Sequence, residues 1–361
     1  MDALQFTVMK QKNKVLYLYA GSRQKFYEDW KRGLVADTQL LGLNHMAKLG
    51  IDAQFIEWSF AEKLRRVSFN LVHIPYIWII RRFDIVFICA GLPLVFLAKY
   101  VLRFKRPKFV IYNTYLTNAL KRHPRGIIHF INRKAIKGID CVVCTARFQE
   151  KFLIELGFDR SKIIFRPIGI DAKKFYDESQ KNHIKASDTP YIASVGRDPG
   201  RDYKTLFEAV RGLPVHVKVA TKPYAVAGLD IPPNVEVLYN IPYEEMPVFY
   251  NKALFAVVPL RDADDPKGSD TSGQYGFLEP MASGKAVIVS DKETVRDYLI
   301  HEKNAFLVKL GDAALLRSAI ERLLSDLEIR KELAQEGQKT VMEKFTSERF
   351  AQSLAEIFKS I

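Results

Sequence analysis

The sequence predicts an α/β protein made of two Rossmann-like domains, each with a doubly wound parallel sheet. Short apolar runs typical of buried strands alternate with longer runs of helical spacing along almost the whole chain. At 361 residues the chain also exceeds the size at which a single hydrophobic core usually stops growing. A polar stretch at 177–189 separates two series of strands and is the best candidate for the connection between domains.

Residues 1–170 contain the first series of strands and are predicted to form one domain. Strands are expected at 15–19, 53–56, 85–88, 109–112, 141–144 and 162–165. Helices are expected at 34–49, which closes on Gly50, and at 94–102. Strands that alternate with helices in this way form a parallel sheet.

Residues 171–344 contain the second series and are predicted to form the other domain. Strands are expected at 191–195, 215–220, 235–239, 254–259, 286–290 and 305–308. Apolar side chains at helical spacing predict an amphipathic helix at 312–324. Residues 345–358 have the pattern of a capped amphipathic helix that closes the chain.

The positive charge of the chain is concentrated in its first half. Residues 1–181 contain 32 Lys and Arg against 15 Asp and Glu, while the remainder contains 23 against 26. A basic domain of this kind suits an anionic partner, such as phospholipid headgroups, a lipid diphosphate or nucleic acid. Of these, we do not expect nucleic acid as a partner. The alternative is that the charge serves only solubility.

Two apolar stretches, 67–80 and 85–98, are both too short to span a bilayer. The second divides into a strand and a helix. The first has basic and aromatic flanks, and both a core helix and a helix lying on a membrane remain open for it. No signal peptide is visible and the three cysteines suit a reducing compartment, so we expect a cytoplasmic protein, with contact at the membrane face left open.

A basic, glycine-containing loop follows the predicted strand 191–195. It contains Gly196, Arg197 and Arg201, with Lys204 close behind in the helix. Such a loop lies at the carboxyl edge of a sheet, where helix amides and guanidinium groups can bind a diphosphate together. A solvated turn is the alternative interpretation.

A second, more specific constellation lies at 268–285, between two predicted strands. The small residues Thr271, Ser272 and Gly273 at a helix start allow the backbone to approach phosphate closely. Glu279 follows in that helix, where a carboxylate can accept hydrogen bonds from ribose hydroxyls. A helix cap followed by a surface glutamate accounts for the glycines but not for the whole arrangement.

These segments, with 250–259 and 286–290, resemble the donor domain of the retaining GT-B-fold glycosyltransferase family (group 1, family 4-like). The resemblance covers residues 163–310 well, and the first half only by its α/β pattern. It implies two domains facing each other across a cleft, with the last helix, 345–361, packed back on the first domain. It also implies the following roles. Arg197 and Arg201 would bind the donor diphosphate, with Lys204 in reserve. Glu279 would bind the ribose, and Ile241 and Tyr243 would lie beside the nucleobase. The phosphate and the sugar would be surrounded by Gly196, Ser272, Gly273 and Gln274.

The implied reaction moves a hexosyl unit from a nucleoside diphosphate sugar to a hydroxyl of a glycan, lipid-linked or cell-envelope acceptor, with retention of configuration. Gly21, Asn113 and Thr114 lie in loops of the first domain that could face the acceptor. No cofactor or metal is expected, because arginines are available for the diphosphate. The alternative is that a metal ion held by Asp262, Asp264 and Asp265 binds the diphosphate.

Two departures from the family pattern leave other functions open. The family commonly has two glutamates with seven residues between them, and Thr271 stands where the first is expected. Pro280 also removes one backbone N–H from the helix. A non-catalytic polyanion-binding protein with a degenerate donor site, or a nucleotide-sugar epimerase, are the alternatives.

Overall fold

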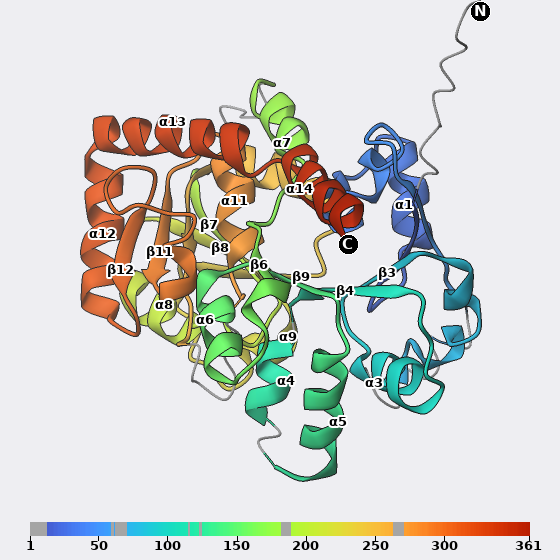
Figure 1. The fold of residues 1–361 in the computed structure, drawn as a ribbon. Helices are drawn as coiled ribbons and strands as arrows, with labels where there is room; N and C mark the ends of the chain where they lie inside the picture. The colour runs from blue at the N-terminus through green and yellow to red at the C-terminus, as the bar shows by residue number, and fades with distance from the viewer. Residues whose placement is uncertain are drawn as a thin grey trace, which may run out of the picture.

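Two α/β domains, each built around a six-stranded sheet, make up the protein (Figure 1). The computed structural model describes residues 13–58, 61, 71–114, 116–122, 125–181, 189–262 and 271–361. Neighbouring strands within both sheets are parallel. The fold class predicted from the sequence is therefore confirmed.

The N-terminal sheet has the strand order β2-β1-β3-β4-β5-β6, the flavodoxin-like arrangement in which the chain changes sides at β1. Its strands are β1 (Lys14–Leu18), β2 (Asp52–Phe55), β3 (Ile85–Ile88), β4 (Lys108–Asn113), β5 (Cys141–Cys144) and β6 (Ile163–Phe165). The helical segments of this half are α1 (Gln24–Lys31), η1 (Asp37–Leu40), η2 (Leu43–His45), η4 (Ile74–Tyr76), η5 (Ile79–Arg82), α3 (Leu92–Phe96), η6 (Leu97–Val101), α4 (Leu116–Arg122), α5 (Gly126–Lys137), α6 (Arg147–Glu155) and η7 (Arg160–Lys162). The next helix, α7 (Ala172–Ser179), packs against the C-terminal domain.

The C-terminal sheet has the order β12-β11-β10-β7-β8-β9, so the chain changes sides at β7. Its strands are β7 (Tyr191–Val195), β8 (His216–Thr221), β9 (Val235–Tyr239), β10 (Ala253–Val258), β11 (Val287–Asp291) and β12 (Phe306–Lys309). The helical segments are α8 (Tyr203–Val210), α9 (Pro223–Val226), η8 (Tyr243–Glu245), α10 (Met246–Asn251), α11 (Gln274–Ala282), η9 (Glu293–Val295), α12 (Ala313–Ser325), α13 (Leu327–Lys344) and α14 (Ser347–Ser360).

Each of the twelve strands expected from the sequence is present, with ends shifted by at most one residue. The central strands were recognisable because helices cover both faces of a parallel sheet, so that their side chains are apolar on both sides. All four residues of β3 and all four of β5 are buried, for example. The predicted helix at 312–324 is α12, which Asp312 caps by accepting a hydrogen bond from the Leu315 amide at 2.9 Å.

The prediction of a single helix at 34–49 is wrong. The segment instead forms η1 and η2, separated by Leu41 and Gly42, whose φ angles of 50° and 80° lie in the left-handed region. Helix α14 approaches closely here, because a Cβ on Gly42 would lie 2.9 Å from the Cβ of Ala351. The apolar spacing was recognised correctly, since Leu40, Leu43 and Met46 are buried, but a contact with a distant helix breaks the helical path.

The described part of the apolar stretch 67–80 belongs mostly to the core, while residues 67–70 lie outside the described residues. Val72, Tyr76, Ile77 and Ile80 are buried, and only Trp78 among the large apolar side chains there is strongly exposed. The stretch 85–98 forms β3 and α3 as expected, and the helix continues as the π-helical segment η6. No helix in the described part of the chain is both long enough and apolar enough to cross a membrane.

Helix α14 leaves the C-terminal domain and packs on the N-terminal sheet (Figure 1). The ring of Phe358 lies 6.2 Å from that of Tyr17 in β1 and 5.8 Å from that of Phe87 in β3. Phe350 contacts Tyr112 in β4 at 5.7 Å. These rings are part of one buried apolar cluster that includes residues of both sheets.

A buried carboxylate ties the start of α14 to the first domain. Asp37 Oδ2 accepts hydrogen bonds from Asn44 Nδ2 at 2.7 Å and from Ser347 Oγ at 3.0 Å. The His45 ring lies 2.9 Å from the same oxygen, and this interaction raises the pKa of His45 against the opposing effect of burial. The amide of Asp37 in turn donates to Asp171 Oδ2 at 3.0 Å, next to the connection between the domains.

Replacing Gly169 by alanine should destabilise this crossing. A Cβ there would lie 2.2 Å from the carbonyl oxygen of Thr346 and 2.8 Å from Phe350 Cβ, so the backbone would have to move. We expect a loss of about 1–3 kcal/mol in the free energy of unfolding, measured by urea denaturation. Gly21→Ala is the control, because its Cβ would make only an ordinary 3.7 Å contact. Equal losses in both variants would contradict the tight packing described for α14.

Candidate active site

The candidate site lies where the C-terminal sheet changes direction. Strand β7 is flanked by β8 on one side and β10 on the other, so the loops that follow β7 and β10 separate at the carboxyl edge of the sheet. Ligands of open α/β sheets bind in the crevice formed at such a switch point. Both constellations found in the sequence follow these two strands.

The loop after β7 is held from several sides. The carbonyl oxygen of Gly196 accepts hydrogen bonds from the Thr221 hydroxyl at 2.6 Å and from the Tyr203 hydroxyl at 2.8 Å. The Gly200 carbonyl accepts from the amide of Arg261 at 2.9 Å, which joins this loop to the one after β10. Asp202 caps α8 by accepting from the Thr205 amide at 3.3 Å. These hydrogen bonds fix the loop to the rest of the domain, so it is not a solvated turn.

Arg201 is a buried cation in the middle of the site, with only 6% of its surface exposed. A Cβ on Gly196 would lie 1.8 Å from its Nε, and a Cβ on Gly276 would lie 2.8 Å from its Nη2. Its Nε lies 3.2 Å from Asp198 Oδ2, without the alignment of a hydrogen bond. Nε and Nη1 have no hydrogen-bond partner among the described residues, so this guanidinium has donor capacity that fits an anionic group.

The start of α11 lies against the same loop. Gly273 precedes the helix with a φ of 97°, a conformation that favours glycine. A Cβ on Gly200 would lie 2.6 Å from Ser272 Oγ, so the two loops touch. Ser272 Oγ is buried without a hydrogen-bond partner among the described residues. The helix N-terminus and Arg201 thus converge at one point, as required to bind phosphate oxygens.

Glu279 lies farther along α11 and is 4% exposed. Its Oε1 accepts a hydrogen bond from the Tyr243 hydroxyl at 2.8 Å. Burial raises the pKa of Glu279 to about 7, against the opposing effects of this hydrogen bond and of Arg197 and Arg201. Burial is also the main reason that the pKa of Tyr243 lies well above its ordinary value.

Arg197 and Ile241, predicted from separate stretches, are brought together. Arg197 Nη2 donates to the Ile241 carbonyl at 2.8 Å, and the Tyr224 hydroxyl donates to the Arg197 carbonyl. Tyr243 packs against Phe26 of α1 with ring centroids 6.0 Å apart, which brings the first domain to the same edge. The Arg197 side chain thus lies at the exposed surface of the site, and the Arg201 side chain lies in its buried part.

Two predicted residues have other contacts in the structure. The buried Gln274 side chain donates to the Thr145 carbonyl and to the Tyr298 hydroxyl, both at 3.1 Å. The Tyr298 hydroxyl itself donates to the Thr145 carbonyl at 2.6 Å and accepts from the Ile168 amide at 3.0 Å, so Gln274 belongs to a contact between the domains. Lys204 is exposed on α8, with its Nζ 3.8 Å from Glu208 Oε1.

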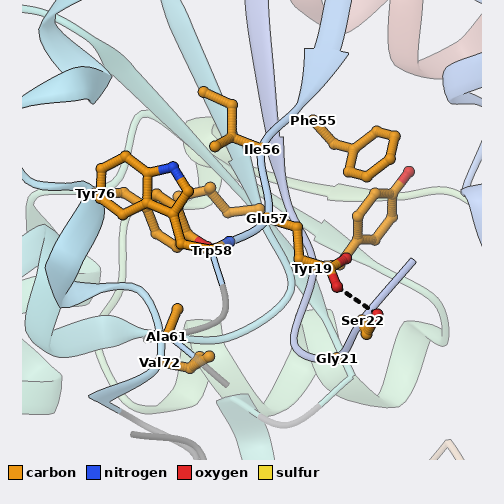
Figure 2. A pocket seen from close by; sticks show the side chains of 11 residues that line it. Tyr19, Gly21, Ser22, Phe55, Ile56, Glu57, Trp58, Ala61, Val72 and Tyr76 are labelled. Atoms are coloured by element: carbon orange, nitrogen blue, oxygen red, sulfur yellow. Dashed lines mark hydrogen bonds between the residues drawn. The ribbon is translucent and has the colours of Figure 1, made fainter. Parts of the chain in front are cut away.

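The acceptor-side candidates lie at the carboxyl edge of the N-terminal sheet. Asn113 is fully buried and its side-chain amide donates to the Thr117 hydroxyl at 3.0 Å, which makes this side chain part of the core. Thr114 follows it, with its amide donating to the Tyr112 carbonyl at 3.0 Å. Gly21 lines a pocket together with Glu57 and Trp58 (Figure 2).

Sequence reasoning missed Glu57 and Tyr298. Glu57 accepts hydrogen bonds from the Ser22 hydroxyl and from the amides of Arg23 and Gln24, at 2.7 and 3.1 Å for the amides, and so supports the start of α1 beside the pocket in Figure 2. Its position just after a predicted strand was a usable signal. Tyr298 has no such signal, because its role depends on contacts with residues more than a hundred positions away.

The acidic alternative for a metal site falls largely outside the described residues, since Asp264 and Asp265 are not among them. Within the part of the chain that the structure describes, no group of three His, Cys, Asp or Glu side chains is arranged to hold a metal ion.

The raised pKa of Glu279 predicts that the free energy of unfolding depends on pH. Because the folded protein holds this proton more tightly than the unfolded chain, stability falls as pH rises from about 4.5 to about 7. Glu279→Gln removes that loss, so without nucleotide it should be more stable than the parent by about 1–3 kcal/mol at pH 8.5, with a smaller difference at pH 5. Urea denaturation at both values measures this. Glu208→Gln on exposed α8 is the control, and parallel pH profiles for parent and Glu279→Gln would contradict the assignment.

Comparison with known proteins gives a family match and two relatives. The family described as glycosyl transferases group 1 matches residues 175–340. A lipopolysaccharide core biosynthesis glycosyltransferase of Rhizobium meliloti, LpsE, is 24% identical over 241 residues, which is 62% of this chain and 65% of that protein. EpsD of Bacillus subtilis is 34% identical over 83 residues, 23% of this chain and 22% of that protein. The chain thus aligns with less than two thirds of the length of each.

Solved structures share the fold over nearly the whole chain. Sucrose-phosphate synthase from Thermosynechococcus elongatus has a TM-score of 0.72 at 18% identity and covers 97% of this chain and 98% of its own. The Anabaena protein HepE, solved in complex with UDP-glucose, has a TM-score of 0.69 at 13% identity and covers 97% of this chain and all of its own. The chain thus has the GT-B fold, and its residues 175–340, which include Arg201, Gly273 and Glu279, match the family model of glycosyl transferases group 1.

Proposed function

We propose that the protein is a glycosyltransferase that moves a hexosyl unit from a nucleoside diphosphate sugar to an acceptor hydroxyl. The observation that carries the proposal is the buried Arg201 guanidinium beside the start of α11, with two donor atoms unpartnered among the described residues. A cation and a helix N-terminus at one point suit a diphosphate. The family match over residues 175–340 supports the same function.

The donor would be held along the edge of the C-terminal sheet. In this proposal Arg201 and the amides at Ser272 and Gly273 bind the diphosphate. Glu279 lies within the same helix and would accept hydrogen bonds from the ribose hydroxyls, with the base beside Ile241 and Tyr243. The HepE structure with UDP-glucose supports a nucleotide sugar as the class of donor.

The chemistry would rest on the leaving diphosphate. As the glycosidic bond breaks, negative charge grows on the diphosphate, and cations already in place stabilise it without reorganisation. The acceptor oxygen would form its bond to the anomeric carbon on the face that the diphosphate leaves, and its proton would pass to the diphosphate. Attack on that face would retain the anomeric configuration. Arg197 and Arg201 would supply charge that other enzymes take from a metal, so we propose that no metal is required.

The acceptor proposed is a glycan, lipid-linked or cell-envelope molecule bound by the basic first domain. The likeness to LpsE, whose name places it in lipopolysaccharide core biosynthesis, supports an envelope acceptor. The pocket of Figure 2, beside Gly21, is the candidate for part of that site. A cytoplasmic location with contact to an anionic membrane belongs to the same proposal.

A panel of nucleoside diphosphates and nucleotide sugars tests the donor site directly. A ligand that binds only the folded state at about 100 times its Kd should stabilise the protein by about 2.7 kcal/mol and raise its melting temperature. We expect a selective rise with one base, which Glu279→Ala should weaken and the control Glu208→Ala should not. No rise with any of them would favour a non-catalytic polyanion-binding protein, and donor turnover without any acceptor would favour an epimerase.

Arg197→Ala tests the role of charge in turnover. Because charge on the diphosphate is larger in the transition state than in the bound donor, we expect kcat to fall about 10- to 100-fold with a smaller change in the donor KM. Arg211→Ala, at an exposed arginine paired with Asp230 on another part of the domain, serves as the control. Initial rates with the donor identified by the panel would measure both, and an unchanged kcat in Arg197→Ala would contradict the proposed role.

A further inference from the structure

One continuous segment of the first domain has no negative side chain. Residues 85–139 contain eleven Lys and Arg and no Asp or Glu. The acids that bound it, Asp84 and Asp140, are both paired with cations of this segment, Asp84 with Arg106 at 3.4 Å and Asp140 with Lys108 at 3.2 Å. Even these flanking charges are therefore neutralised locally, and this part of the protein has a positive field.

Large apolar side chains are exposed in this same segment. Tyr100, Val101, Ile127, Ile128 and Phe130 have between 38% and 70% of their surface exposed. On α5, residues 127, 130, 134 and 137 follow the spacing of a single helix face, with apolar side chains in the first turn and lysines behind them. This face is amphipathic along its length, with an apolar end and a basic end.

A cation joins α5 to its neighbour η6. Lys134 Nζ lies 5.8 Å from the ring centroid of Phe130 in its own helix and 5.8 Å from that of Tyr100 in η6. Helices α4 and α5 project from one edge of the molecule (Figure 1). We call the residues Tyr100, Val101, Ile127, Ile128, Phe130 and Lys134 the α5 surface.

We propose that the α5 surface docks onto a lipid bilayer with anionic headgroups. The apolar side chains would enter the boundary between headgroups and acyl chains, while Lys134, Lys137 and Arg125 bind headgroup phosphates. The contact lies on α5 and η6 rather than on residues 67–80, whose described apolar side chains are buried or half-buried apart from Trp78. The proposal stands on exposure and charge alone and does not depend on the glycosyltransferase reaction.

Other partners fit these side chains less well. A nucleic acid backbone would bind the cations but offers nothing to an isoleucine with 70% of its surface exposed. Protein interfaces are depleted in lysine at their centres, and here a lysine lies between the two aromatic rings. A bilayer surface accommodates both kinds of side chain, because aromatic and aliphatic groups insert while long cationic side chains reach the headgroups.

Sedimentation with vesicles tests the proposal on the full chain. We expect binding to phosphatidylglycerol–phosphatidylcholine vesicles, little binding to phosphatidylcholine alone, and weaker binding at higher salt. The double variant Ile127→Ser with Phe130→Ser should lose at least about tenfold in vesicle partitioning. Lys134→Gln with Lys137→Gln should lose binding to the anionic vesicles, which provides a second test if the first variant folds poorly by circular dichroism.

Leu315→Ser with Leu327→Ser is the matched control, since both leucines are about half exposed on the other domain, and its partitioning should equal that of the parent. The melting-temperature shift with the donor should persist in the α5 variants, which separates this proposal from that of the reaction. Equal binding of the parent to both vesicle types, or none to either, would overturn the proposal. So would salt-sensitive vesicle binding that Ile127→Ser with Phe130→Ser leaves unchanged, because that result indicates general polyanion binding.

Discussion

The packing of α14 on the N-terminal sheet is the contact on which the arrangement of this protein depends. The helix begins at the end of the C-terminal domain, yet its buried rings lie against β1, β3 and β4 of the other one. Close approach is possible because Gly42 and Gly169 have no side chain where the helix passes. The carboxylate of Asp37 adds a polar anchor at the first turn, through Ser347. Together these contacts bring Phe26 of α1 to Tyr243 and Thr145 to Tyr298, so both domains contribute to the edge where the site lies.

The candidate site in the C-terminal domain contains a buried cation, Arg201, and a buried acid, Glu279, both largely removed from water. Removing a guanidinium from water is costly unless partners replace the lost hydration. Among the described residues, Arg201 has Asp198 as its close carboxylate, in imperfect alignment. Glu279 is protonated more readily than an exposed glutamate because it is buried. Groups held in this way are poised to interact with a ligand that brings negative charge and hydroxyl groups. The same reasoning explains why perturbed ionisation concentrates at functional sites.

The α5 surface has the opposite physical character. Its large apolar side chains are exposed to solvent, and residues 85–139, which contain it, have no Asp or Glu to pair with its lysine. A basic domain that also presents isoleucine and phenylalanine to solvent is better suited to an interface of lipid and water than to water alone. The proposed donor site and this surface lie in different domains, so the two proposals can be tested separately.

The sequence by itself determined the two parallel sheets and placed the candidate site in the loops after two of their strands. Central strands of a parallel sheet are buried on both faces, so they were visible as short apolar runs such as 85–88 and 141–144. The glycines and arginine after β7 indicated a phosphate site. Only the tertiary structure decided how these parts meet. Residues 34–49 have helical spacing, yet the approach of α14 at Gly42 breaks the helix. The hydrogen bonds that the Gln274 side-chain amide donates to Thr145 and Tyr298, across the contact between the domains, were not predicted either. The burial of Arg201 and the raised pKa of Glu279 could not be predicted from their neighbours in the sequence. Both depend on residues that the fold brings to the site from distant parts of the chain.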